Sequence, residues 1–441
     1  MTNKIEVMMV QGPRIYNLFP LLAGSIRDWE AHLPRIAEMG FNWLFLNPFH
    51  YPGFSGSLYA VKDYYRLHPV FQGGSRKTPD ALLAAFVRQA EDHGINVMMD
   101  LVINHTGRDS ELVAQHPEWF AREADGSVRS PFAVDPDHPD DVAKRTVWGD
   151  LAEIDYEHPA DLEGLMAYWK ALVRHYVELG FHGFRCDAAY KVPGDIWAEI
   201  IAAAREAYPD THFFAETLGC QPEEVAQLHD AGFDYLFNSA KWWDFQEDWL
   251  LEQYEAYRHI APSVAFPESH DTERLAAESG GDERVSRLRY LFAAFFSGGV
   301  MMPVGFEFGF RHKLDVVKTR PDNWEKPLFD LTDFVRATNE MKASTPLLNE
   351  EGLQVRFTAP HAPLVGLLRH GSGSGGRVAA LINSDPEHSH DFSIQEMAEA
   401  MASALEHIRE ITPLSVHGPL AGHSRIRLAP WEMRVFYAEG G

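Results

Sequence analysis

The stretch GFHGFRCDAAYKVP, from Gly180 to Pro193, places two opposite charges within an otherwise apolar run. Arg185 and Asp187 are two residues apart, and side chains at positions i and i+2 lie on the same side of a β-strand. If residues 181–187 form a strand, both charges share one face and Cys186 points the other way. Burying a charge is costly unless the charge is paired. The stretch therefore predicts either a structural ion pair or part of a functional site.

Composition limits the classes of protein to which the chain can belong. Its 441 residues are enough for a large barrel with additions. With 39 basic and 64 acidic residues, the net charge of −25 argues against nucleic acid or an anionic membrane as a partner. The only two cysteines, Cys186 and Cys220, indicate a reducing compartment. No apolar run of about 18 residues predicts a membrane span, and no leader peptide is recognised, so we expect a cytoplasmic protein.

Strand-like and helix-like runs alternate along most of the chain. Eight runs read as strands, at residues 4–10, 41–49, 95–105, 181–187, 211–219, 233–238, 262–270 and 299–307. Amphipathic runs read as helices at residues 26–40, 78–94, 161–180, 194–208, 223–232, 283–298 and 331–344. This alternation predicts parallel βα units, and eight strands predict an α/β protein with a closed (β/α)₈ TIM barrel. An open doubly wound sheet is the alternative, but no glycine-rich phosphate motif follows the first strand.

Two segments interrupt this repeat. Residues 106–160 are polar and irregular, which predicts a domain inserted after the third strand. After about residue 346 the runs become short, which is typical of an antiparallel β domain. We therefore expect a barrel over residues 1–345, interrupted by an inserted domain at 106–160, and a C-terminal β-sandwich at 346–441.

Polar residues stand where the predicted barrel strands end. In a TIM barrel the βα loops open at the carboxyl ends of the strands, so these side chains should converge on one rim. Acids and bases meeting there suit catalysis by two carboxylates, one acting as an acid and base and one as a nucleophile. The residues are Asp100, Asn104, His105, Arg185, Asp187, Glu216, Glu268, His270 and Asp271.

At these positions the chain resembles the α-amylase family (glycoside hydrolase family 13). DLVINH (100–105), GFRCDAA (183–189), FAETLG (214–219) and ESHD (268–271) resemble the four short motifs of that family, in the same order. The resemblance covers about residues 1–345, and a C-terminal β domain also fits. It implies a retaining glycoside hydrolase that cleaves α-1,4-glucosidic bonds of maltooligosaccharides or related α-glucosides by double displacement.

The resemblance also implies a role for each matching residue. Asp187 would be the nucleophile, Glu216 the general acid/base and Asp271 the third acid, which binds sugar hydroxyls. Of the remaining matches, Arg185 would orient Asp187, His105 and His270 would hydrogen-bond the sugar, Tyr59 would stack beneath it, and Asp100 would support Arg185.

Elementary physical chemistry agrees with these roles. Arg185 beside Asp187 should depress the pKa of that carboxyl and keep it ionised. Glu216 follows the apolar run HFFA, a setting that raises a carboxyl pKa, as a proton donor requires. A retaining pair needs its carboxyls about 5–5.5 Å apart. Neighbouring strands lie about 4.8 Å apart, so Asp187 and Glu216 at the ends of adjacent strands can have this spacing.

Other functions stay open. HPEWFAREADGSV (116–128) resembles the inserted domain of bacterial maltosyltransferases that use maltose-1-phosphate. We do not expect the large N-terminal domains of those enzymes here, and the SHD sequence at the seventh strand is typical of hydrolases, so hydrolysis is the leading interpretation. An α-glucan transglycosylase or maltosyltransferase-like enzyme is the alternative. A non-catalytic amylase-like binding protein is a third reading, against which the presence of all three acids argues.

No cofactor is predicted. In many amylases an asparagine after the third strand binds calcium, and Asn104 matches it, but Lys191 stands where a histidine carbonyl would serve. This favours a metal-free loop. Trp242, Trp243 and Trp324 fit either sugar platforms or core packing, and Glu268 fits either the site or a loop. We expect an α-glucan or maltooligosaccharide as the partner, and the oligomeric state stays open.

Overall fold

The fold was analysed in a computed structural model that describes residues 11–133, 142–371, 375–417, 420 and 423–439. Eight parallel strands form a closed barrel in the order in which they occur along the chain, and the last pairs with the first. The strands are β1 (Arg14–Asn17), β2 (Trp43–Leu46), β5 (Asn96–Leu101), β10 (Gly183–Cys186), β11 (His212–Glu216), β12 (Tyr235–Phe237), β13 (Ser263–Ala265) and β14 (Gly299–Pro303). The predicted (β/α)₈ barrel is confirmed.

Helices follow the barrel strands and bury an apolar stripe. In α7 this stripe includes Leu165, Trp169, Leu172 and Tyr176, with the spacing of one helical face. The helices of this part are α1 (Pro20–Ala23), α2 (Ile26–Glu30), α3 (Leu33–Glu38), α5 (Pro79–Asp92), α7 (Leu162–Glu178), α8 (Gly194–Ala207), α9 (Pro222–Ala226), α10 (Trp249–Tyr257), α11 (Leu275–Glu278), α12 (Glu283–Phe296) and α13 (Thr332–Ser344).

The start of the barrel differs from the sequence-based expectation. The run at residues 4–10 lies outside the described residues, and the first barrel strand is β1, with the sequence RIYN. The helix expected at 26–40 is two helices, α2 and α3, and α3 has Pro34 in its first turn. Proline lacks the amide hydrogen that a continuous helix would need there.

Aromatic and aliphatic side chains fill the inside of the barrel. Trp43 and Phe45 of β2, Phe214 of β11, Phe237 of β12 and Phe266, directly after β13, belong to one buried cluster. The interior is therefore a packed core, and polar side chains gather above it at the strand ends.

Between β5 and α7 the chain leaves the barrel. β6 (His105–Gly107) pairs antiparallel with β9 (Leu151–Glu153), and β7 (Phe132–Ala133) pairs with β8 (Thr146–Val147). The helix α6 (Glu111–Gln115) lies between them in sequence. A second excursion after β2 contains β3 (His50–Pro52), β4 (Val61–Leu67) and α4 (Pro69–Gln72). Both excursions begin at the carboxyl end of a barrel strand, which is the end of the barrel where the candidate site residues lie.

The C-terminal part is built on an antiparallel sheet. Its five strands, in sheet order, are β15 (Gln354–Arg356), β16 (Val365–His370), β17 (Arg377–Ile382), β21 (Met433–Ala438) and β19 (Ile408–Glu410). A two-stranded ladder of β18 (His390–Ser393) and β20 (Arg425–Leu428), with α14 (Ile394–Ala400), shares a hydrophobic core with it. The division at residue 345 and the limits 106–160 stay our proposal for the domain boundaries.

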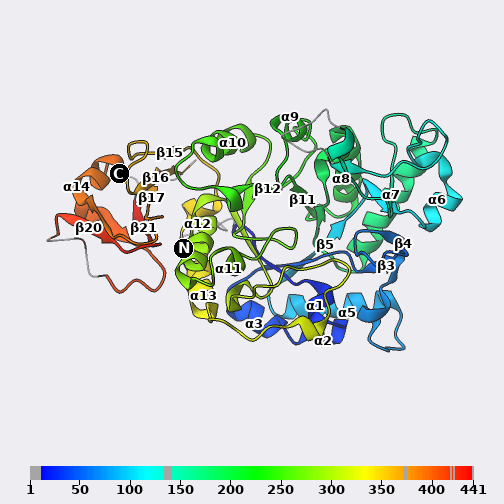
Figure 1. The fold of residues 1–441 in the computed structure, drawn as a ribbon, viewed down its shortest axis with the longest axis horizontal. Helices are drawn as coiled ribbons and strands as arrows, with labels where there is room; N and C mark the ends of the chain where they lie inside the picture. Colours follow the sequence, from blue (N-terminus) through cyan, green and yellow to red (C-terminus); the bar gives the residue numbers. More distant parts are fainter. Residues whose placement is uncertain (1–10, 134–141, 372–374, 418–419, 421–422, 440–441) are drawn as a thin grey trace, which may run out of the picture.

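Figure 1 shows the barrel between these two additions. The C-terminal sheet, in orange and red, lies at one end of the long axis, and the cyan segment around α6 lies at the other. Among the described residues, no helix has both the length and the apolar character needed to cross a membrane.

Candidate active site

Asp187 and Glu216 occupy equivalent positions on neighbouring strands. In the parallel pair β10–β11, Cys186 is opposite Ala215, and the next residue on each strand is Asp187 and Glu216. The backbone N–H of Ala188 donates to Glu216 Oε2 at 3.1 Å, which ties the two strand ends together. Both acids keep 14% of their side-chain surface exposed. The two carboxyls thus lie at the carboxyl end of the barrel and are open to solvent.

Arg185 links the acids of this rim. Its Nη1 donates to Asp187 Oδ1 at 2.6 Å and to both oxygens of Asp100, at 2.9 and 3.1 Å. Its Nη2 lies 4.0 Å from Glu216 Oε2 and 3.9 Å from Asp271 Oδ2. The planar guanidinium suits several carboxylates at once. The charged pair in the stretch 180–193 is therefore part of a four-acid cluster.

Glu216 is held by backbone donors and has a perturbed pKa. Leu218 N–H donates to its Oε1 at 2.9 Å, and Ala188 N–H to its Oε2. Burial raises the pKa of Glu216 to about 7, with further increases from the charges of Asp187 and Asp271, while Arg185 opposes the rise. A carboxyl with this pKa can hold a proton near neutral pH and then give it up.

Asp271 reaches the site from the loop after β13. Its Oδ2 lies 3.1 Å from Nε2 of His270, and half of its side chain (52%) is exposed. The His270 Nε2 is also 2.7 Å from the Tyr59 hydroxyl, which donates to Asp100 Oδ2 at 2.6 Å. Tyr59, His270 and Asp100 thus form one hydrogen-bonded group beside Arg185. Burial is the main cause that lowers the pKa of His270 and raises that of Asp100 to about 8.

His105 packs on the other side of the same group. Its Nδ1 hydrogen-bonds Oδ1 of Asn104, and its Nε2 lies 3.2 Å from the Tyr59 carbonyl oxygen. The Asn104 amide donates to the Asp187 carbonyl at 2.9 Å and to Asp187 Oδ2 at 3.2 Å. Both ring nitrogens of His105 therefore have protein partners, and its contact with a sugar stays a prediction.

Sequence reasoning missed the asparagines that position Tyr59. Asn47 Nδ2 donates to the Tyr59 hydroxyl at 3.0 Å, and Asn17 Nδ2 donates to Asn47 Oδ1 at 2.9 Å. Both asparagines are fully buried at the ends of β1 and β2. A polar residue directly after an apolar strand is the signal that could have found them, because the other site residues share that placement.

Glu268 belongs to the loop structure. Its Oε1 accepts a hydrogen bond from Arg274 Nη1 at 2.7 Å, and both side chains are 1% exposed. Arg274 Nη2 donates to the Val304 carbonyl at 2.9 Å, beyond β14. This buried ion pair joins the loop that carries Asp271 to the loop after the last barrel strand.

The Asn104 amide, predicted from sequence as a candidate calcium ligand, is used in contacts with Asp187 and His105. Among the described residues, no three acids, histidines or cysteines gather as they would around a metal ion. That the site holds no calcium stays a prediction, and no step below depends on a cation.

A small pocket opens at the acids. Arg185, Glu216, His270 and Asp271 line its polar side, and the tops of the barrel core, including Phe45, line the other. Charged and apolar walls of this kind suit a ligand with hydroxyl groups and apolar ring faces.

Comparisons with known proteins agree with this arrangement. The family model described as "Glycogen debranching enzyme, glucanotransferase domain" matches residues 7–124. An α-1,4-glucan:maltose-1-phosphate maltosyltransferase of Burkholderia pseudomallei is 28% identical over 403 residues, covering 88% of this chain and 34% of that protein. The chain is therefore similar in sequence to a maltosyltransferase over most of its length, and to a glucanotransferase domain over residues 7–124.

Two further relatives are similar to the chain over much of its length. A maltosyltransferase of the same name from Myxococcus xanthus is 26% identical, covering 84% of this chain and 59% of that protein. A cyclomaltodextrinase of a Bacillus species is 26% identical over 65% of this chain and 52% of that protein. The chain thus spans between one third and six tenths of the length of these curated relatives.

Solved structures of other proteins share the fold over nearly the whole chain. An α-amylase from Lactobacillus plantarum covers 96% of this chain and 98% of its own, with a TM-score of 0.69 at 20% identity. The trehalose-6-phosphate hydrolase of Bacillus licheniformis covers 97% and 99%, with a TM-score of 0.75 at 13% identity. At these identities the likeness concerns the fold.

Proposed function

We propose that the chain is a retaining glycosidase that cleaves α-1,4-glucosidic bonds of maltooligosaccharides by double displacement. The observation that carries this proposal is the placement of Asp187 and Glu216 at equivalent ends of adjacent strands, both beside Arg185 and both open to solvent. Carboxyls on neighbouring strands have the spacing that a retaining mechanism needs, about 5 Å.

In the first step Glu216 donates its proton to the glycosidic oxygen while Asp187 Oδ attacks the anomeric carbon. The C–O bond to the leaving sugar breaks, and an ester forms between Asp187 and the retained sugar. Arg185 holds the attacking carboxylate, and Asn104 donates to its other oxygen. The negative charges of Asp187 and Asp271 stabilise the positive charge that develops on the sugar.

In the second step Glu216 acts as a base. The charge on Asp187 contributes to the raised pKa of Glu216, and this charge disappears when Asp187 becomes an ester. The pKa of Glu216 therefore falls in the intermediate, and the carboxylate can take a proton from the incoming nucleophile. Attack by that nucleophile breaks the ester and restores the original anomeric configuration.

Transglycosylation is the second candidate, because the incoming nucleophile can be a sugar hydroxyl instead of water. The observation that favours it is the similarity to proteins named maltosyltransferases over 84–88% of the chain. Those names describe transfer from maltose-1-phosphate to an α-1,4-glucan. The same two carboxyls and the same ester intermediate would serve this reaction.

Product analysis with maltoheptaose tests the proposal. We expect shorter oligosaccharides with new reducing ends, released in the α configuration by NMR at early times. Longer oligosaccharides would instead show transfer, and a parallel incubation with maltose-1-phosphate and a glucan would test that donor. Products of the β configuration would contradict double displacement.

A matched variant tests the assignment of the acid. Glu216→Gln cannot donate a proton but keeps the shape of the side chain, so turnover should fall about 10³-fold, within the usual range for general acid catalysis. Binding of maltoheptaose, measured by calorimetry, should persist. Near-normal turnover of this variant would show that another group is the acid.

A further inference from the structure

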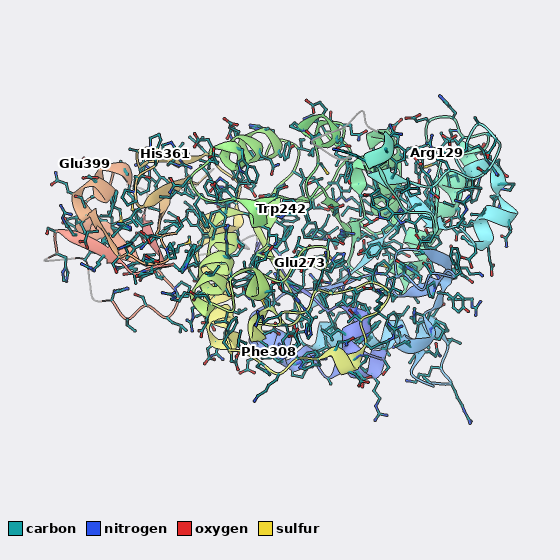
Figure 2. All side chains as sticks on the ribbon, viewed as in Figure 1. Arg129, Trp242, Glu273, Phe308, His361 and Glu399 are labelled. Atoms are coloured by element: carbon teal, nitrogen blue, oxygen red, sulfur yellow. The ribbon has the colours of Figure 1, made fainter. Side chains whose placement is uncertain are left out.

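An exposed tryptophan follows the barrel strand next to Glu216. Trp242 ends a short 3₁₀ turn, η4 (Ala240–Trp242), after β12, and 52% of it is exposed. Its neighbour Trp243 is fully buried and packs against Phe245 and Phe292. In the view of Figure 2, Trp242 is labelled near the middle of the molecule, between the C-terminal part and the insertion. The two adjacent tryptophans therefore have different roles, and packing explains Trp243.

The indole of Trp242 lies on the loop that carries Glu216. A Cβ placed on Gly219 would lie 3.5 Å from Cζ3 and 3.6 Å from Cη2 of Trp242, which is van der Waals contact. Gly219 has a φ of +74°, and its N–H donates to Ser239 Oγ at 3.1 Å. The loops after β11 and β12 are therefore joined at the point where the indole rests, three residues beyond Glu216.

The turn that presents Trp242 is fixed from below. Lys241 is buried, and its Nζ lies 2.9 and 3.0 Å from the two carboxylate oxygens of Glu278 in α11. The Ala240 N–H donates to Asn238 Oδ1 at 3.1 Å. A fixed turn presents the exposed indole at low entropic cost, as a preformed ligand platform requires.

The order of strands around the rim indicates which part of the substrate lies near Trp242. Asp187 follows β10, Glu216 ends β11 and Trp242 follows β12, and these strands are consecutive neighbours. Asp187 attacks the anomeric carbon, and Glu216 protonates the oxygen on the leaving side of that carbon. The leaving sugar therefore lies toward Glu216 and the loop beyond it.

We propose that Trp242 is a specificity-determining residue, a platform on which the leaving sugar stacks. The apolar face of a pyranose packs on an aromatic ring, while its hydroxyls stay in water. This inference rests on the proposed glycosidase function. In the second step the same platform holds an incoming acceptor sugar, so Trp242 raises the share of transglycosylation relative to hydrolysis.

The test compares a substrate that needs the platform with one that does not. α-Maltosyl fluoride releases fluoride, which requires no sugar platform, whereas maltoheptaose releases a sugar. For Trp242→Ala we expect the KM for maltoheptaose to rise about tenfold, because the variant loses one aromatic contact with the sugar. The ratio of transfer to hydrolysis, with maltosyl fluoride as donor and maltose as acceptor, should fall by a similar factor. Hydrolysis of maltosyl fluoride alone should stay at the wild-type rate.

Two further variants complete the design. Trp242→Phe keeps an aromatic face and should restore most of the maltoheptaose KM and the transfer ratio. Trp324→Ala removes another partly exposed tryptophan, whose ring stacks on His32, and should behave like the wild type. If Trp242→Ala loses activity on maltoheptaose and on maltosyl fluoride to the same extent, or keeps both unchanged, the proposed role of Trp242 as a platform is wrong. A wild-type enzyme inactive on both substrates would contradict the proposed function, and the platform with it.

Discussion

Arg185 shows how the site works at the scale of single residues. Its guanidinium contacts Asp100 and Asp187 directly and faces Glu216 and Asp271 at about 4 Å. One positive charge thus organises four acids, which would otherwise repel one another at this distance. The sequence predicted these residues because each stands at the end of an expected strand.

Other residue-scale features were beyond prediction from the sequence. In the fold the Asn104 amide contacts Asp187 and His105, a use of the side chain that its sequence motif does not indicate. The position of Trp242 depends on a contact between two loops that share no sequence pattern. Such contacts are set by the packing of neighbouring βα units and appear only in the folded chain.

The raised pKa of Glu216 predicts a pH-dependent difference in stability between the wild type and Glu216→Gln. Burial raises the pKa of Glu216 from 4.5 to about 7, so between these values the folded state binds a proton that the unfolded state has released. The associated stability is present below pH 4.5 and is lost as the pH rises through 7. Relative to the wild type, Glu216→Gln should therefore gain about 3 kcal/mol in free energy of unfolding between pH 4 and pH 8.

Denaturant titrations at several pH values measure this difference. The same pKa predicts that kcat/KM of the wild type falls above about pH 7, because the acid form is lost. A difference in free energy of unfolding that stays constant from pH 4 to pH 8 would show that Glu216 titrates normally.

At the scale of elements, the loops after β13 and β14 depend on a buried ion pair. Glu268 and Arg274 bond to each other, and Glu268 Oε2 also accepts from the Leu275 N–H at 2.5 Å, at the start of α11. Arg274 reaches across to the carbonyls of Val304 and His312. The pair fixes the loop on which Asp271 stands. Glu268 could be read from ESHD, but its structural role could not, because its partner Arg274 lies outside that motif and is held by carbonyls beyond β14.

We predict that Glu268→Gln destabilises the protein by about 3–5 kcal/mol, because it leaves the Arg274 charge buried and uncompensated. Lys313→Met is the matched control, since Lys313 pairs with Glu273 at 3.4 Å and both side chains are about half exposed. Exposed pairs contribute about 0–1 kcal/mol. Urea unfolding of both variants measures the difference, and equal losses would contradict a special role for the buried pair.

Most element bounds followed from the sequence, and the exceptions have physical causes. The helix expected at 78–94 is α5, and Thr78 caps it, with the Ala81 N–H donating to its Oγ1 at 3.3 Å. The helix expected at 26–40 divides because of Pro34. The first barrel strand is the short RIYN segment of β1, whose polar ends hide its buried position from a reading of apolar runs.

At the scale of the whole molecule, the barrel and the C-terminal sheet share buried polar contacts. Arg369 of β16 is fully buried, and its Nη1 donates to the Phe295 carbonyl of α12 at 2.5 Å. Gln354 of β15 donates to the Phe296 carbonyl at 2.7 Å. Glu351 accepts from the Ser263 N–H of β13 at 2.8 Å and from the Gly298 N–H at 3.0 Å. Separating the two parts would leave these groups without partners.

We therefore predict that the chain unfolds in one calorimetric transition. Unfolding one part alone would break these hydrogen bonds and expose the hydrophobic core in which Phe295 and Phe296 of α12 cluster with Leu367 and Val378 of the C-terminal sheet. Arg369→Met should lower the midpoint of that single transition. Two separate transitions in the wild type would show that the barrel and the C-terminal sheet are independent.

The central claim is that Asp187 forms a covalent bond to the sugar while Glu216 moves the proton. It is tested most directly by mass spectrometry of Glu216→Gln after brief reaction with α-maltosyl fluoride, which needs no acid to release fluoride. The account predicts a maltosyl group on the peptide that contains Asp187, with no such adduct when Asp187→Asn is added. A maltosyl group on any other carboxyl would contradict it.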